Sequence, residues 1–511
     1  MNNSIHIDRA PSRRRTALIR LMFNYSSTLF AVINGIILVP LYLHYFDLST
    51  YGAWLASGNV IAILGLLDAG LTTVVAQQLA HHYGAKNLNR FAQTAGAGIV
   101  MFVLICGIMT ILSLSFAHLI PPKVNADPSQ YAPLALGFKI AGIGAALSLA
   151  RMAVHSVAGA WQRPIFVGIA SILALIGGVT AILVGLWTGW GVAALGLGVL
   201  VRGIIGFSLT LTYVAFIWSN LRIPKPAFHW GEIKSLLQTT APLFVGRTSA
   251  VLLANSESLI VAVFLNPQLA AILALTGRAF SLAHMVINPI QSAVAAGMAH
   301  LSGDKPRTYQ YSVVKEVFVL ISIAIAMVAG PTLVLNQTFV SLWVGPSRFG
   351  GILLNAAICL ATVSLSQAQL VGMIMTSLGE LKNAGWITLI DAGLRLIFII
   401  CLLPWIKILG MPLAAFVATT CTFFLWLRLL KRYFSLGQKD CFHFVLSAWV
   451  PMLLILPVSF VLSWLEPQAK TWFTFFGYST IAAFAASIIA YSSNGLFRDK
   501  VNRFLNIIAP I

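Results

Sequence analysis

The chain has 511 residues, of which 59% are apolar and 9% are charged. A soluble protein carries roughly a quarter charged residues, so this composition excludes a soluble fold and predicts a membrane protein. A net charge of +19 would suggest nucleic acid binding in a soluble chain. Here the positive charges lie in short segments between apolar runs, which excludes that function. The five cysteines form no CxxC pair and no cysteine–histidine cluster is evident, so we expect no disulfide framework, no metal and no cofactor.

The apolar residues gather in runs long enough to cross a bilayer. A helix needs roughly 20 residues to span about 30 Å of hydrocarbon, and only helices or closed barrels satisfy their backbone in lipid. The first run exceeds a signal-peptide core and lacks a cleavage pattern, so we expect it to be retained. The sequence therefore predicts an all-α polytopic protein with about 14 transmembrane helices. The predicted spans are 17–43, 51–78, 92–119, 131–157, 165–187, 190–218, 235–263, 268–298, 311–337, 350–378, 385–406, 409–430, 443–465 and 471–492.

The distribution of lysine and arginine predicts the orientation of these spans. With the N-terminus in the cytoplasm, 22 basic residues fall in inner loops, 4 fall in outer loops and six fall inside helices. Inner loops of membrane proteins carry an excess of positive charge. We therefore expect both termini in the cytoplasm.

A repeated motif indicates that the chain is duplicated. Residues 80–86 read AHHYGAK and residues 299–305 read AHLSGDK, so the pattern AHxxGxK recurs at an offset of 219. The same offset carries Arg163, after the fourth span, onto Lys382, after the tenth. Self-similarity at one constant offset is the sequence signature of an internal repeat.

The repeat predicts the domain organisation. We expect an N-lobe of six spans over residues 1–218, a cytoplasmic linker over 219–234, a C-lobe of six spans over 235–432, and two added spans with a tail over 433–511. An even number of helices per repeat gives two pseudo-symmetric lobes of the same orientation, with a substrate cavity between them. This arrangement predicts alternating access.

Three short motifs resemble a known family. Tyr51–Trp54 (YGAW), Gly65–Leu71 (GLLDAGL) and Leu342–Pro346 (LWVGP) resemble segments of bacterial O-antigen-type polysaccharide flippases. These belong to the multidrug/oligosaccharidyl-lipid/polysaccharide exporter (MOP) superfamily, which includes the MATE transporters. The resemblance implies outward movement of an undecaprenyl-pyrophosphate-linked glycan across the bacterial inner membrane for lipopolysaccharide biosynthesis. It also implies a central cavity lined by helices 1, 2, 7 and 8, and contact with bilayer lipids. It leaves open whether the protein works alone or beside a glycan polymerase or other surface-polysaccharide assembly proteins.

Ionisable residues at membrane depth are costly and usually functional or paired. Six basic residues against three acidic ones leave a cationic excess, which suits an anionic ligand. The basic residues are Lys139, Arg151, Arg202, Arg247, Arg278 and Arg395, and the acidic residues are Asp68, Glu257 and Asp391.

Arg247 and Arg278 fall near the middle of the seventh and eighth spans. We expect both to hold the pyrophosphate, because a guanidinium matches phosphate geometry through two parallel hydrogen bonds. A purely structural role, in a buried ion pair, is the alternative. Asn34 and Asn59, on the first two spans, are candidates for binding sugar hydroxyls or for joining helices.

The remaining charged residues each leave two interpretations. Asp68, in the second span, is a candidate for substrate binding or for proton or sodium coupling, and alternatively a structural partner. Glu257 is a second coupling candidate. Arg151 and His155 share one face of the fourth span and either receive the headgroup from the cytoplasm or extend to lipid phosphates.

Asp391 and Arg395 have the spacing of an ion pair along one helix, which indicates a structural role.

Two rival functions differ in their sequence requirements. A cation-coupled multidrug exporter of the same superfamily would favour acidic cavity residues and usually has twelve helices. A membrane enzyme would need an external catalytic segment, and the longest predicted outer loop, 120–131, carries no such constellation. No GxxxxGK[ST] phosphate loop is present. We therefore expect a flippase rather than an enzyme.

Overall fold

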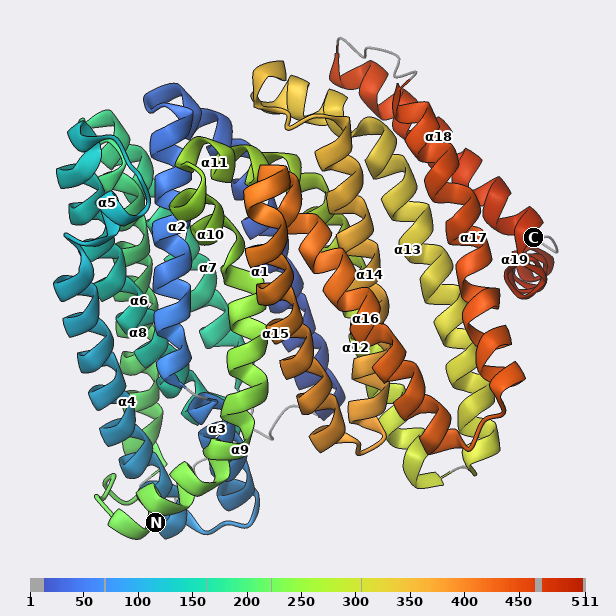
Figure 1. The fold of residues 1–511 in the computed structure, drawn as a ribbon. Coiled ribbons are helices and arrows are strands. Elements are labelled where there is room, and N and C mark those ends of the chain that lie inside the picture. Colours follow the sequence, from blue (N-terminus) through green and yellow to red (C-terminus); the bar gives the residue numbers. More distant parts are fainter. Residues whose placement is uncertain are drawn as a thin grey trace. The chain divides into compact units, whose positions relative to one another are not determined.

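The computed structural model describes residues 13–68, 70–161, 163–221, 223–304, 306–464 and 471–508. Arg9, Arg222, Lys305 and Lys470, which entered the loop count, lie outside this part of the chain. The described residues form helices and no strands (Figure 1). The predicted all-α polytopic fold is therefore confirmed.

The chain divides into two compact units, Met1–Ala271 and Ile272–Ile511. The first contains α1 (Arg13–Tyr45), α2 (Leu48–Leu64), the 3-10 turn η1 (Gly65–Asp68), α3 (Leu71–Gly84), α4 (Leu88–Phe116), α5 (Ile120–Lys123), η2 (Pro128–Gln130), α6 (Tyr131–Ala160), α7 (Pro164–Trp187), α8 (Ala193–Asn220), α9 (Trp230–Asn255) and α10 (Glu257–Phe264). Helix α11 (Pro267–Thr276) crosses the boundary. The second contains α12 (Arg278–Asp304), α13 (Arg307–Val344), η3 (Pro346–Arg348), α14 (Ile352–Ser377), α15 (Leu381–Ile406), η4 (Lys407–Leu409), α16 (Gly410–Phe434), α17 (Gln438–Trp464), α18 (Trp472–Ser493) and α19 (Gly495–Ile508).

Ten helical segments in the described residues are long and apolar enough to cross a membrane, or eleven if the bent pair α11–α12 counts as one span. One of these segments, Leu381–Phe434, contains both α15 and α16, which are joined by η4 and pack against one another (Figure 1). The count of fourteen stays a prediction.

Helix boundaries recur at the offset found in the sequence. Helix α2 begins at Leu48 and α11 at Pro267, a separation of 219 residues. Helix α4 begins at Leu88 and α13 at Arg307, again a separation of 219 residues. The same local structures therefore follow one another in both halves of the chain, as a duplication requires.

The contact boundary at 271/272 differs from the predicted linker at 219–234 because α9 and α10 pack within the first unit. Helix α9 contacts α2, α3 and α4, and α10 contacts α2. The amide of Asn125 also donates to the carbonyl oxygens of Ala262 and Val263 at the end of α10, at 3.0 and 2.9 Å. The division into lobes by sequence repeat stays a prediction.

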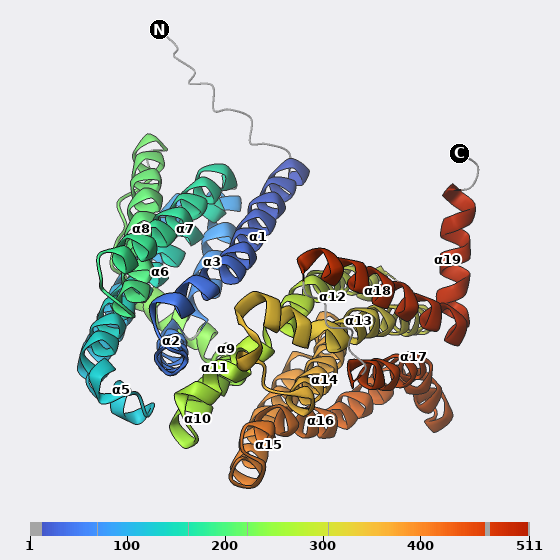
Figure 2. The ribbon, with the colours of Figure 1, turned by 90° about the horizontal axis from the view of Figure 1, so that it is seen from above.

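Helices α6 and α8 form the most extensive contact of the first unit (Figure 2). Gly137 and Gly144 on α6 face Gly196 and Gly203 on α8, and both pairs are seven residues apart. A Cβ atom added at Gly196 would lie 2.3 Å from the Gly137 carbonyl oxygen, and one at Gly203 would lie 2.5 Å from that of Gly144. Small residues let two backbones approach this closely, which is how helices commonly associate in membranes.

Candidate functional site

The second predicted span is interrupted where Asp68 lies. Helix α2 ends at Leu64, η1 follows, and Gly70 has a φ of 91°, a conformation that favours glycine. Asp68 is 2% exposed, and its Oδ1 accepts hydrogen bonds from the backbone amide of Thr72 at 3.0 Å and from its hydroxyl at 2.6 Å. The carboxylate therefore caps the first turn of α3, which is a structural task that sequence reasoning left open.

The seventh predicted span is interrupted as well. Helix α9 ends at Asn255 and α10 begins at Glu257. The Asn255 amide donates to the Val251 carbonyl at 2.9 Å, and the Ser256 hydroxyl donates to that of Leu252. Glu257 is exposed at the start of α10. Arg247 lies within α9, but its side chain is outside the described structure.

The eighth predicted span bends by 47° between α11 and α12, at Gly277. The end of α11 is held by neighbours in the second unit. The Asn336 amide donates to the Thr276 carbonyl at 2.8 Å, and the Gly350 amide donates to the Thr276 hydroxyl at 3.0 Å. Because these partners occupy the last turn of α11, the helix stops and a new one starts.

Arg278 is the first residue of α12, directly after this bend. Its Nε atom is buried and makes no hydrogen bond to any residue in the described part of the chain. The partial positive charge at the start of α12 is opposed by the partial negative charge at the end of α11, one residue away. The guanidinium itself therefore supplies the positive charge at the bend, where the sequence predicted a diphosphate contact.

The three predicted spans 51–78, 235–263 and 268–298 thus share one departure from expectation. Each was predicted as a continuous helix, and each is broken near an ionisable residue: Asp68, Glu257 or Arg278. In secondary transporters, discontinuous helices of this kind form the substrate and ion sites. Asn34 and Asn59 are half-buried on α1 and α2.

Arg151, for which the sequence left two interpretations open, packs against α7 and α8 within the first unit. Its Nη1 lies 3.5 Å from the Ser171 hydroxyl of α7, and its stem packs against Gly206 of α8, where an added Cβ would lie 2.7 Å from its Cδ. His155 is exposed on the same helix. Both residues line a hollow of about 760 Å³ in the first unit, together with Arg163.

Asp391 and Arg395 form the predicted ion pair, with 3.6 Å between Oδ2 and Nη2. Both are buried and are held by the neighbouring helix α16. The Thr422 hydroxyl donates to Asp391 Oδ1 at 3.0 Å, and Arg395 Nη2 donates to the Thr419 hydroxyl at 3.3 Å. The pair therefore joins α15 to α16.

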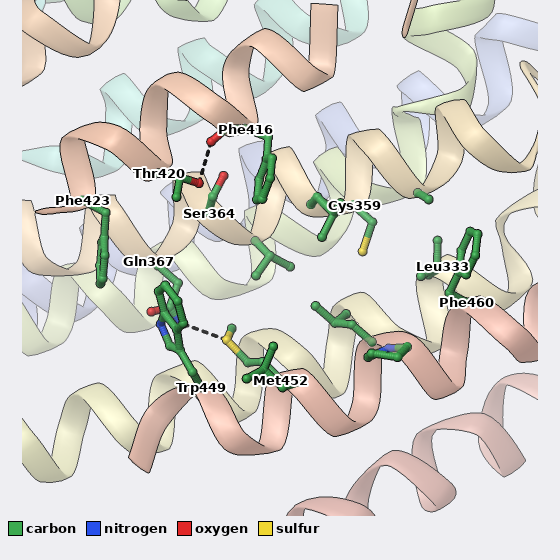
Figure 3. A pocket seen from close by; sticks show the side chains of 16 residues that line it. Leu333, Cys359, Ser364, Gln367, Phe416, Thr420, Phe423, Trp449, Met452 and Phe460 are labelled. Carbon is green, nitrogen blue, oxygen red and sulfur yellow. Dashed lines mark hydrogen bonds between the residues drawn. The ribbon is translucent and has the colours of Figure 1, made fainter. Parts of the chain in front are cut away.

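Sequence reasoning missed an apolar pocket of about 500 Å³ in the second unit, between α13, α14, α16 and α17 (Figure 3). Its wall includes Phe416, Phe423, Trp449 and Phe460, and its main polar group, Gln367, donates to the Met452 sulfur at 3.2 Å. The available signal was a pair of prolines within α17, one of which lines the pocket, because proline disturbs regular helix packing.

A polar cluster lies on the first unit beyond the apolar part of α3. His81 and His82 lie there beside Arg90 of α4 and Glu232 of α9. Burial lowers the pKa of His82 below its usual value, His81 and Arg90 act in the same direction, and Glu232 opposes them. Among the described residues no group of three or more His, Cys, Asp or Glu is placed to hold a metal ion.

Broken helices that carry ionisable residues within an all-helical polytopic fold are typical of secondary transporters. Residues 145–347 match the family model described as "Polysaccharide biosynthesis protein". No curated protein matches the chain significantly.

Several solved structures have the same fold. A structure named "Lipid II flippase MurJ, inward closed conformation" is 13% identical to this chain, with a TM-score of 0.71. The match covers 95% of this chain and 100% of the MurJ chain. An inward-facing multidrug resistance MATE family transporter of the MOP superfamily is 14% identical, with a TM-score of 0.61. That match covers 82% of this chain and 99% of the transporter chain. A structure of the MATE multidrug transporter DinF-BH is 15% identical, with a TM-score of 0.57. That match covers 83% of this chain and 96% of the DinF-BH chain.

The chain therefore resembles polysaccharide biosynthesis proteins and has the fold of the MOP superfamily. This confirms the resemblance predicted from the motifs. The solved proteins with this fold are flippases and transporters, not enzymes.

Proposed function

We propose that this protein is a flippase that moves an undecaprenyl-pyrophosphate-linked oligosaccharide from the cytoplasmic to the outer leaflet of the bacterial inner membrane. The observation that carries the proposal is Arg278, a guanidinium at a helix bend whose buried Nε has no partner among the described residues. A diphosphate supplies the acceptor oxygens that such a group needs. The match to a polysaccharide biosynthesis model and the similarity to a lipid II flippase support a lipid-linked glycan.

In the proposed cycle, Arg247 and Arg278 hold the diphosphate while Asn34 and Asn59 bind sugar hydroxyls. The lipid tail stays in hydrocarbon, and the apolar pocket of the second unit offers a surface of suitable chemistry. Movement of the lobes then exposes the headgroup on the outer side. The product feeds surface polysaccharide assembly, with a glycan polymerase as the partner and both termini of the flippase in the cytoplasm.

A cation-coupled multidrug exporter is the second candidate, because the fold is shared with MATE transporters. This function would use Asp68 or Glu257 as the coupling acid. Asp68 already caps α3, and Glu257 is exposed at the end of a helix break. The positions of these two acids therefore give the exporter function weak support. The midplane arginines give the flippase function stronger support.

The proposal is tested by translocation of a fluorescent undecaprenyl-pyrophosphate glycan in proteoliposomes. We compare wild type with Arg247→Ala and Arg278→Ala, and use Arg428→Ala as the control because it removes an exposed arginine on α16. Loss of charge-assisted hydrogen bonds worth about 1.5–3 kcal/mol predicts at least a roughly tenfold slower rate for both variants and an unchanged rate for the control.

Two results would contradict the proposal. Normal translocation by both folded arginine variants would assign them a structural role. A wild type that moves no lipid-linked glycan but expels an organic cation would establish the exporter instead.

A further inference from the structure

The hollow that contains Arg151 is a separate feature of the first unit. It has a volume of about 760 Å³ and is bounded by α3, the end of α6, the start of α7 and Phe23 of α1. Its volume lies within the range of small-molecule binding sites, roughly 300–1,000 Å³. It is reached from the surface of the unit, because His155 on its wall is exposed.

The lining of this hollow is basic. Arg151, His155 and Arg163 line it, and none of the described residues on its wall is acidic. Basic side chains in a hollow without a carboxylate attract an anion. The side chain of Arg151 is oriented by packing against Gly206 and by its contact with Ser171, so its position does not depend on an ion pair.

Neutral hydrogen-bonding groups complete the lining. Thr73 and Gln77 contribute exposed side chains from α3, whereas the hydroxyls of Thr72 and Ser156 already donate to Asp68 and to the Met152 carbonyl. Hydroxyl and amide groups of this kind bind phosphate oxygens and sugar hydroxyls without adding charge. The hollow therefore combines groups suited to a phosphate with groups suited to a sugar.

The hollow extends along the helix axes. Arg163 immediately precedes Pro164, the first residue of α7, and Arg151 lies nine residues before Ala160, the last residue of α6. At 1.5 Å per residue, Arg151 is about 14 Å from that helix end. One guanidinium thus lies at the helix boundary and the other lies deeper, along the path of a headgroup that enters from the loop side.

We propose that this hollow is a loading site that binds the diphosphate and first sugar of a polyprenyl-linked glycan. The proposal rests on the proposed function and adds a second site for the same substrate. Arg163 contacts the diphosphate where the headgroup enters, Arg151 holds it deeper in the hollow, and Thr73 and Gln77 of α3 bind the sugar. A bilayer phospholipid offers one phosphate and no sugar, so it uses only part of this lining.

The test measures binding to the full-length protein in detergent, with a fluorescent short-chain polyprenyl diphosphate as the probe. We compare wild type with Arg163→Ala and with Arg151→Gln, which keeps a hydrogen-bonding group near Ser171. Lys123→Ala is the control, because it removes an exposed basic side chain on α5 of the same unit, outside the lining of the hollow. All four proteins also carry Arg278→Ala, so that the other proposed diphosphate contact does not bind the probe. In that background we expect each pocket variant to weaken binding at least about tenfold, and the control to bind as the protein with an intact hollow does.

Competition identifies the ligand. Inorganic pyrophosphate should displace the probe, and phosphatidylglycerol should do so at least about tenfold less well. Equal displacement by phosphatidylglycerol would make the hollow a general phospholipid site and overturn the proposal. Unchanged binding in both folded pocket variants would overturn it as well.

Translocation by the same variants separates this proposal from the proposed function. Slower transport at low substrate concentration, recovered at high concentration, is expected for loss of a loading site. Normal transport by Arg151→Gln and Arg163→Ala at every substrate concentration, together with loss of transport in Arg278→Ala, would support the flippase function. The same result would contradict the loading site.

Discussion

The Asp391–Arg395 ion pair allows the contribution of one buried charge to the stability of this protein to be measured. The two side chains are 10% and 7% exposed and are held by threonines of α16. Removing one partner of a buried pair leaves an uncompensated charge, at a cost of about 3–5 kcal/mol. We expect Asp391→Ala to lower the unfolding temperature in detergent, measured by intrinsic fluorescence.

The double variant Asp391→Leu with Arg395→Met is the control. It removes both charges while keeping similar volume, and replacing a buried pair in this way is often neutral. Its unfolding temperature should lie near that of wild type. If Asp391→Ala is as stable as wild type, the pair has no structural role.

Single residues also show the limits of sequence reasoning. Asp391 and Arg395 were predicted to pair because both lie on one helix, four residues apart. A structural role was one of two interpretations left open for Asp68, and the helix break beside it is a feature that a hydropathy pattern does not reveal. The roles of Arg247 and Arg278 as diphosphate contacts stay predictions.

The glycine contact between α6 and α8 belongs to the scale of whole elements. At Gly196 the atoms that an added Cβ would meet are backbone atoms of Gly137, which cannot turn aside as a side chain can. We expect Gly196→Ala to force the helices apart and to destabilise the protein by about 1–3 kcal/mol. Thermal unfolding in detergent measures this effect.

Gly107→Ala on α4 is the matched control, because an added Cβ there meets nothing within 4 Å. It should be neutral or slightly stabilising, since alanine favours helix over glycine by up to about 1 kcal/mol. Equal behaviour of the two variants would show that close approach of α6 and α8 does not matter for stability.

The length of an apolar run predicts that a helix exists but not whether it continues. Gly58 lies inside a continuous α2, whereas Gly277 separates α11 from α12. The difference comes from Asn336 and Gly350, which bind the last turn of α11. The apolar run 268–298 continues through this break, so its length does not reveal the break.

At the scale of the whole molecule, the proposed function predicts a response to voltage. Outward movement of one negative charge across an inside-negative membrane is favourable by roughly 2.3 kcal/mol per 100 mV. We expect an inside-negative potassium diffusion potential to accelerate outward translocation in proteoliposomes. A pH gradient at zero potential is the control, and acceleration by that gradient alone would indicate coupling through Asp68 or Glu257 instead.

The sequence by itself determined the class of this protein, its helical architecture and the periodicity of its helix boundaries. The reason is local: a backbone in lipid must satisfy its own hydrogen bonds, so each long apolar run becomes a helix. The 219-residue offset appears both in the motifs and in the helix starts at Leu48 and Pro267.

Only the tertiary structure decided where helices break, which way Arg151 points and where cavities lie. Each of these features depends on residues distant in the chain. Asn336 reaches Thr276 across 60 residues, and the stem of Arg151 packs on Gly206. The apolar pocket likewise needs α14, α16 and α17 together. Such contacts are absent from any single helix, which is why composition and spacing did not reveal them.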